Sequence, residues 1–274
     1  MAGVSSESLT AALAALEAKL PTASLQLAKE LFGILGTVDS SAGLRRALTD
    51  PSRNGDEKSA LVKQLIGGKV SAEAVEITSG LAGSRWASAR DIGDALETLA
   101  ASVVIAVAEN KSAVSASGLS GLEALENDLF AFNQTVESSH EIQRALSEPQ
   151  ASPAAKIALA EKLVPGASAE AKVLIGQAVS QPRGLRVTRL VGRFAELAAQ
   201  RQQRWIATVS VTRPLTATQT SRLQAALDEL YGRELKINST VDPALIGGIR
   251  VQVGDEVVDA SVLARLGQLQ RQLA

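Results

Sequence analysis

Few side chains in this sequence could carry out covalent or metal chemistry. The 274-residue chain has no cysteine and a single histidine, His140. The absence of cysteine excludes disulfides, thiolate metal sites and cysteine nucleophiles, and one histidine is too few for a histidine-rich metal site. A Ser-His-Asp triad needs only one histidine, but the sequence has neither a G-x-S-x-G elbow nor an H-E-x-x-H pair. We therefore predict no catalytic residue, no metal site and no cofactor, and a surface or capping role for His140.

Two other patterns could bind phosphate groups or nucleic acid. The segment Gly67-Gly68-Lys69-Val70-Ser71 is similar to a phosphate-binding loop. It lacks the upstream glycine, the Ser or Thr directly after the lysine and a preceding strand, so we interpret it as a helix stop. Arginines recur at helical spacing further along the chain, at Arg183, Arg186, Arg189 and Arg193, followed by Arg201 and Arg204. This arginine stripe could contact RNA, but few aromatic side chains are available for base stacking, which favours a solvated or protein-facing stripe.

The composition describes a chain that can form sizeable cores without a bulk attraction for polyanions. Hydrophobic residues make up 46 % of the chain, charged residues make up 21 %, and the formal net charge is −1. No basic and apolar leader opens the sequence, and the longest apolar stretch, 99–108, is about half of the ~20 residues that a membrane span needs. We expect a soluble protein that contacts a membrane only through a partner.

An internal repeat organises the first three quarters of the chain. Between 31–66 and 129–164, an offset of 98, 14 of 36 ungapped positions are identical. Thr37-Val38-Asp39-Ser40-Ser41 recurs as Thr135-Val136-Glu137-Ser138-Ser139, and Pro51 recurs as Pro149. Matching of low-complexity helices does not explain these shared polar and proline positions, so we predict a duplicated domain.

Each copy of the repeat is predicted to be helical, because Ala, Leu, Glu, Lys and Gln dominate and aromatic residues are only 3 % of the chain. Six helices are expected over residues 1–105, beginning with one that Pro21 ends. The second copy, 106–203, lacks a good match to that first helix. The end of the long sixth helix, which runs toward Ala108, is a candidate to fill its place.

From Trp205 onward the hydrophobic period changes to two. Ala207, Val209 and Val211 alternate with polar residues, and further alternating segments follow near 235–241, 249–253 and 256–258. Thr216 and Gln219 form a capping box at the start of an intervening helix, and Ser261 is expected to cap a final one. Residues 204–274 are therefore predicted to form a small α+β domain, strand-helix-strand-strand-strand-helix. The fold class is mainly α, with two tandem helical bundles before this domain.

A family resemblance becomes specific in this last domain. The run 241–254 reads Val-Asp-Pro-Ala-Leu-Ile-Gly-Gly-Ile-Arg-Val-Gln-Val-Gly and is followed by Val258-Asp259-Ala260-Ser261-Val262. It resembles the C-terminal signature of the delta subunit family of F-type ATP synthases, to which the mitochondrial oligomycin-sensitivity-conferring protein belongs. Ala260 departs from that family, where glycine is commoner, and the nearly doubled helical bundle resembles long actinobacterial members. The signature positions are Val241, Asp242, Pro243, Leu245, Gly247, Gly248, Ile249, Val251, Gly254 and Asp259.

These signature residues are predicted to determine the fold rather than to catalyse a reaction. Gly247-Gly248 permits positive φ and a close approach of the backbone. Pro243 forces the residue before it out of the helical region, and Gly254-Asp255 suits a hairpin turn. The Asp259 carboxylate can cap the last helix.

The resemblance implies a non-catalytic, peripheral-stalk subunit that resists the torque of the rotor during ATP synthesis. In that family the helical domain binds the N-terminal segments of the alpha subunits on the alpha/beta catalytic head, and the C-terminal domain meets the C-terminal helices of the b subunit. The implied location is peripheral, on the cytoplasmic face of the cell membrane, with no nucleic acid bound. The family's groove lies between the first and fifth helices, here about 7–20 and 71–84. We favour the first copy as the alpha-binding bundle, although the second copy is joined directly to the C-terminal domain and could hold the site instead. An RNA- or ribosome-associated adaptor that uses the arginine stripe is the alternative function.

Overall fold

The computed structural model describes residues 3–111, 121–203, 206–231, 235–242, 245, 247–253 and 256–259. It divides into two compact units, Met1–Ala198 and Ala199–Ala274. In the described residues the first unit is built from helices and the second contains a four-stranded sheet. The predicted fold class, mainly α with a small α+β domain, is confirmed. The predicted boundaries at residues 105 and 203 stay predictions.

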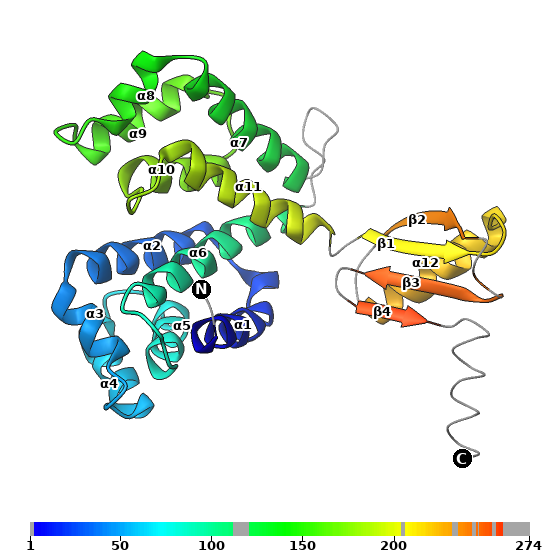
Figure 1. The fold of residues 1–274 in the computed structure, drawn as a ribbon, viewed down its shortest axis with the longest axis horizontal. Coiled ribbons are helices and arrows are strands. Elements are labelled where there is room, and N and C mark those ends of the chain that lie inside the picture. The colour runs from blue at the N-terminus through cyan, green and yellow to red at the C-terminus, as the bar shows by residue number, and fades with distance from the viewer. Residues whose placement is uncertain are drawn as a thin grey trace. The chain divides into compact units, whose positions relative to one another are not determined.

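The first repeat copy contains the six predicted α-helices (Figure 1). They are α1 (Val4–Glu17), α2 (Leu25–Ser40), α3 (Ala42–Thr49), α4 (Gly55–Ile66), α5 (Ala72–Gly83) and α6 (Asp91–Asn110), with a short 3₁₀ turn, η1 (Leu20–Thr22), after α1. The first helix ends four residues before Pro21, so the expectation that Pro21 ends it is wrong. Pro21 instead stands near the start of the 3₁₀ turn, where its missing N–H leaves no hydrogen bond unmade.

In the described residues, the second copy repeats this plan from α2 onward. It consists of α7 (Gly121–Glu137), α8 (His140–Ser147), α9 (Pro153–Leu163), α10 (Ala169–Ser180) and α11 (Val187–Gln203).

Three helix starts in each copy use the same local chemistry. Serine hydroxyls accept hydrogen bonds from backbone N–H groups in the first turn, which would otherwise lack a partner. These N-cap serines are Ser24, Ser41 and Ser71 in the first copy and Ser139, Ser152 and Ser168 in the second. A carboxylate supports one equivalent pair: Glu30 accepts from the N–H of Ser71 at 3.0 Å, and Asp128 accepts from the N–H of Ser168 at 2.8 Å. Two of these caps occupy matching positions, Ser41 with Ser139 and Ser71 with Ser168, which supports the predicted duplication.

One helix belongs to the core of both copies. α6 packs against α2 and α5 in the first copy and against α7 and α10 in the second. Its run Val103–Ala106 is buried on every side, and a single buried cluster contains side chains from both copies. The Lys111 ammonium lies 2.7 Å from the Glu170 carboxylate, which holds the end of α6 beside the start of α10. α6 therefore meets α10 as α1 meets α5, in agreement with the prediction that its end fills the missing place.

The second unit has the predicted order of elements as far as residue 259. β1 (Ile206–Val211) pairs in parallel with β2 (Lys236–Val241), and α12 (Ala217–Tyr231) makes the crossover between them. β3 (Ile249–Val253) is antiparallel to β1, and β4 (Glu256–Asp259) is antiparallel to β3, which gives the order β2-β1-β3-β4. Alternate residues of β1 and β3 are buried together with Leu227 of α12. The capping box is confirmed, because Thr216 N–H donates to Gln219 Oε1 at 2.9 Å. The final helix predicted from Ser261 lies outside the described residues.

Candidate protein-docking sites

A groove of about 300 Å³ lies between α1 and α5 in the first copy. Its lining combines small side chains with buried leucines and one ion pair. The lining residues are Ala11, Ala12, Ala15, Leu16 and Lys19 from α1, Glu76, Ile77, Gly80, Leu81 and Ser84 from α5 and its end, and Leu99 from α6.

The shape of this groove follows from the size of its residues. Leu16, Leu81 and Leu99 are at most 2 % exposed and supply an apolar floor. Gly80 is exposed, and a Cβ at that position would meet no atom within 4 Å. Small residues on both walls allow another backbone to approach closely, so the groove suits the apolar face of a partner helix.

Hydrogen bonds to distant segments hold α1 in place as a wall of the groove. The buried Ser5 hydroxyl donates to Asp91 Oδ2 at 2.6 Å and accepts from the Ala87 N–H at 2.8 Å. At the other end, Asn110 Nδ2 donates to the Leu20 carbonyl at 2.8 Å. The groove is therefore formed before any partner binds, which lowers the entropic cost of docking.

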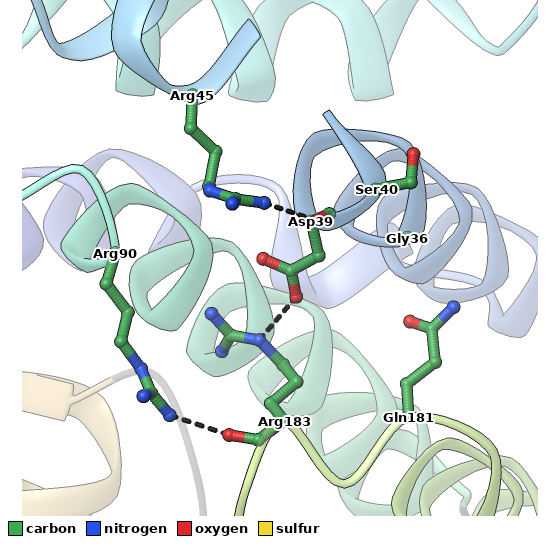
Figure 2. Close-up of a pocket in the computed structure, with 7 residues that line it drawn as sticks. All are labelled: Gly36, Asp39, Ser40, Arg45, Arg90, Gln181 and Arg183. Carbon is green, nitrogen blue, oxygen red and sulfur yellow. Dashed lines mark hydrogen bonds and ion pairs between the residues drawn. The ribbon is translucent and has the colours of Figure 1, made fainter. Parts of the chain in front are cut away.

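A second pocket, of about 520 Å³, lies where the two repeat copies meet (Figure 2). Its lining residues are Gly36, Asp39, Ser40 and Arg45 from α2 and α3, Arg90 before α6, and Gln181 and Arg183 from the connection between α10 and α11. The second copy thus places a loop against the first.

Arg183 is the centre of the junction. Its side chain is 8 % exposed, its Nε donates to Asp39 Oδ2 at 2.6 Å, and its Nη1 lies 2.7 Å from Asp94 Oδ1 and 3.5 Å from Glu97 Oε2. Figure 2 shows the Arg183 guanidinium pointing toward the Asp39 carboxylate, and Arg90 donating to the Arg183 carbonyl at 2.6 Å. One buried cation from the second copy is therefore surrounded by three carboxylates of the first.

Close backbone approach makes this arrangement possible. A Cβ on Gly36 would lie 2.7 Å from Gln181 Nε2, and a Cβ on Gly93 would lie 2.5 Å from Arg183 Nη2. Arg183 itself has a positive φ of 51° and precedes Gly184 at 81°, which turns the chain sharply before α11. The junction thus requires glycine at positions 36 and 93 as well as the charged side chains.

The charges at the junction shift one another's protonation. Burial raises the pKa of Glu97 above its usual value, although Arg183 and Arg193 oppose that rise. Burial disfavours the charged form of Arg183, but its hydrogen bond to Asp39 and the charges of Glu97, Asp39 and Asp94 outweigh this, and its pKa is raised. Arg183 is therefore held in its charged form by the carboxylates around it.

The predicted arginine stripe does not exist as one exposed helical face. Arg183 and Arg186 precede α11, and the Arg183 side chain is buried among carboxylates. Arg201, on α11, is 7 % exposed, whereas Arg204 lies outside the described residues. The placement of these arginines on one helical face is wrong, because a connection with positive φ at Arg183 interrupts the helical spacing before α11 begins at Val187. The contact of Arg183 with carboxylates agrees with the favoured, protein-facing interpretation.

His140, Gly68 and Trp86 each have a structural role or a surface position. His140 is an exposed residue in the first turn of α8, in agreement with the predicted surface role. α4 ends at Ile66, Gly67 is its C-cap and Gly68 follows with a φ of 74°, which confirms the helix stop. Trp86 is buried and donates from Nε1 to the Leu81 carbonyl at 2.8 Å, so it belongs to the core; Trp205 lies outside the described residues.

The signature positions lie at the end of β2 and along β3 and β4. Val241 is 51 % exposed, and the Asp242 N–H donates to the Val211 carbonyl at 2.8 Å. Gly247 and Gly248 both have positive φ, 76° and 89°. Leu245 is 8 % exposed, and Ile249 and Val251 pair with Val211 and Val209 of β1. The backbone of Asp259 pairs with Arg250, while Pro243 and Gly254 lie outside the described residues.

Metal binding and membrane insertion are two further classes of function that concern the described residues. Among them, no group of three or more His, Cys, Asp or Glu side chains is placed to hold a metal ion. None of the described helices combines the length and hydropathy needed to cross a bilayer.

Comparison with known proteins identifies relatives along the full length of the chain. The family model described as ATP synthase delta (OSCP) subunit matches residues 110–273. Proteins named ATP synthase subunit delta are 88 % identical in Arthrobacter sp. (strain FB24) and 65 % identical in Renibacterium salmoninarum, each over 274 residues and all of both chains. The Streptomyces griseus protein of the same name is 37 % identical over 278 residues and also all of both chains.

A chain of the Toxoplasma gondii mitochondrial ATP synthase hexamer is a more distant match, 22 % identical with a TM-score of 0.33, covering 63 % of this chain and 94 % of that one. That likeness is too distant to support an argument. The family match and the full-length relatives, taken with the helical repeats and the terminal sheet, show that the chain belongs to the ATP synthase delta (OSCP) subunit family.

Proposed function

We propose that this chain couples the catalytic head of the F-type ATP synthase to its peripheral stalk by binding a helix of the head in the α1–α5 groove. As a member of its family, the chain is a non-catalytic stator subunit of that synthase. Its partners on the head, in this proposal, are the N-terminal segments of the alpha subunits, with beta subunits alongside. The preformed apolar groove between α1 and α5 carries the proposal.

The first copy is the better candidate for this partner than the second. In the first copy α1 and α5 are separate walls, and the exposed Gly80 leaves room between them. In the second copy the end of α6 lies where a wall equivalent to α1 would stand, and the Lys111–Glu170 ion pair holds it against α10. That end of α6 is already buried in the shared core, so it cannot open a groove without disrupting the fold.

The C-terminal unit is proposed to contact the b subunit of the stalk. Several of its apolar side chains are exposed: Leu230, Val241, Val257 and Val258 are each at least 42 % accessible. Exposed apolar side chains on a small domain favour contact with apolar helix faces. Together the two contacts would hold the chain at the cytoplasmic face of the membrane, as a peripheral component.

A pair of glycine substitutions tests the groove in the full-length chain. Gly80→Leu places a side chain in the groove, whereas Gly33→Leu adds the same side chain to an exposed and open position on α2. We expect binding of a labelled alpha N-terminal peptide, followed by fluorescence anisotropy, to weaken about 10-fold or more in Gly80→Leu, which corresponds to ~1.4 kcal/mol. Gly33→Leu should leave the affinity unchanged. Binding that survives Gly80→Leu would move the site elsewhere, the second copy included.

A further inference from the structure

A third pocket, of about 560 Å³, lies on the second copy where the end of α7, α8 and the start of α11 meet. Three buried side chains, Val136, Leu146 and Val187, form its apolar part. The other lining residues are Glu137, His140, Gln143, Arg144, Ser147, Arg186 and Thr188.

This pocket is the repeat equivalent of the junction pocket on the first copy. At the offset of 98, Asp39 corresponds to Glu137, Arg45 to Gln143 and Arg90 to Thr188, and all six residues line their respective pockets. A hydrogen bond is also repeated, because Gln143 Nε2 donates to the Glu137 carbonyl at 3.2 Å where Arg45 donates to the Asp39 carbonyl. The duplicated fold has therefore built one pocket twice.

The two pockets differ in what occupies them. On the first copy, the pocket receives Gln181 and Arg183 from the second copy. On the second copy, every lining residue comes from that copy's own α7, α8, the start of α11 and Arg186 just before it. No other segment of the described chain enters this second pocket, although its counterpart shows that the position can hold an inserted segment.

The two copies also differ in the carboxylates beside the pocket. The carboxylates of Asp94 and Glu97, which surround Arg183 in the junction, correspond to Gly192 and Ala195 in the second copy. Apart from the inserted Arg183, the linings themselves carry the same charges, because Arg144, Arg186 and Glu137 of the second pocket match Arg45, Arg90 and Asp39 of the first in number and sign.

Arg144 and Arg186 are exposed, and neither makes an ion pair in the described part of the chain. Without counterparts of Asp94 and Glu97, an inserted arginine would be poorly stabilised beside these two arginines, whereas an acidic group would be attracted.

We propose that this second-copy pocket docks an acidic segment of a neighbouring subunit in the synthase. The segment presents carboxylates to Arg144 and Arg186 and places an apolar side chain against Val136 and Leu146. The inference does not depend on the α1–α5 groove, and it assigns the second copy a contact of its own.

Photo-crosslinking in the assembled complex tests this contact. The full chain carries p-benzoyl-phenylalanine in place of Ser147, an exposed residue of the pocket, and is rebound to synthase from which the native chain was removed. The test variant is Arg144→Glu with Arg186→Glu. The matched control is Arg189→Glu, an exposed arginine of α11 that does not line the pocket.

We expect a cross-link to one subunit segment in which Asp and Glu outnumber Lys and Arg. Its yield at limiting concentration should fall about 5- to 20-fold in the double variant and with added salt, as for two exposed ion pairs, and should not change in Arg189→Glu. Arg144→Gln with Arg186→Gln should give a smaller loss in the same direction. It stands in for the double variant if thermal unfolding shows that the charge reversals destabilise the fold.

Three results would overturn the proposal. One is a cross-link to a segment without acidic excess, or to RNA. Another is a yield no greater than that from an exposed position outside the pocket. The third is a yield that the charge substitutions leave unaltered. Binding of the alpha peptide in the groove is measured separately, so its loss or survival does not decide this question.

Discussion

Replacing Arg183 by methionine removes the cation at the junction of the two repeat copies while keeping an unbranched apolar side chain. Removing one partner of a buried ion pair costs about 3–5 kcal/mol, because the remaining charge stays desolvated. Two of the three carboxylates can regain water, since the side chains of Asp39 and Asp94 are 28 % and 24 % exposed. Glu97 cannot, at 3 % exposed, but Arg193 remains 3.8 Å away. We therefore expect a loss of ~2–3 kcal/mol in the free energy of unfolding of the helical unit.

Urea denaturation followed by tryptophan fluorescence measures this loss. The chain has two tryptophans, and Trp205→Phe leaves Trp86, in the core of the helical unit, as the only reporter. Arg186→Met is the matched control, because Arg186 is exposed on the same connection, and it should change stability by less than ~0.5 kcal/mol. Adding Glu97→Gln to Arg183→Met should recover part of the loss, since it removes the stranded buried charge.

The same variant should show a defined dependence on pH. Burial raises the pKa of Glu97, and Arg183 opposes the rise, so Arg183→Met raises that pKa further. A carboxyl whose folded pKa is raised binds more protons in the folded state, so its contribution to stability falls as pH rises through that pKa. The loss caused by Arg183→Met should therefore be larger at about pH 8 than at about pH 5. A loss no larger than that of Arg186→Met, or one that grows toward low pH, would refute the assignment of Arg183 as the junction's central charge.

Three further changes have expected outcomes from single contacts. Gly93→Val places methyl groups where a Cβ already approaches the Arg183 guanidinium to 2.5 Å, and it should lower the free energy of unfolding by about 1–3 kcal/mol in urea titrations. Glu30→Gln should remove pH-dependent stability: the Ser71 hydroxyl holds the Glu30 pKa below its usual value, so the parent's advantage is present near pH 6 and is lost toward about pH 3 in unfolding titrations. Gly247→Ala strains a position with a φ of 76° and should destabilise the C-terminal unit by about 1 kcal/mol, seen as faster amide exchange in β3.

The elements of this fold were readable from sequence because local chemistry determines them. Serine caps such as Ser41 and Ser71 mark helix starts, and the period-two run at Val209 and Val211 marks a strand. Each of these signals depends on a few neighbouring residues. Most of the helix signals also occur twice, once in each copy of the repeat. The end of α1 was predicted too far along the chain. A 3₁₀ turn after α1 places Leu20 in the core, and that burial depends on the tertiary fold rather than on the local sequence.

The junction could not be predicted in the same way. The Arg183–Asp39 ion pair joins residues 144 positions apart, and nothing in the spacing of the arginines indicates that Arg183 leaves its helix. Gly36 and Gly93 read as ordinary helix glycines, although a Cβ on either would collide with the second copy. The repeat alignment did contain one usable signal. Carboxylates at Asp94 and Glu97 have no counterpart in the second copy, and such an unmatched charge pair between duplicated units indicates a contact that only one unit makes.

A shared helix and a shared ion cluster join the two repeat copies so that they resist bending against each other. Two domains joined by a flexible linker would rotate against each other under load. Here α6 belongs to the core of both copies, and Arg183 ties the second copy to α2 and α6 of the first. Bending between the copies would expose buried segments such as Val103–Ala106 and would separate a desolvated ion cluster, both of which are strongly unfavourable. Such resistance to bending suits a stator subunit. A stator that bent between the two copies would yield to the rotor torque instead of opposing it.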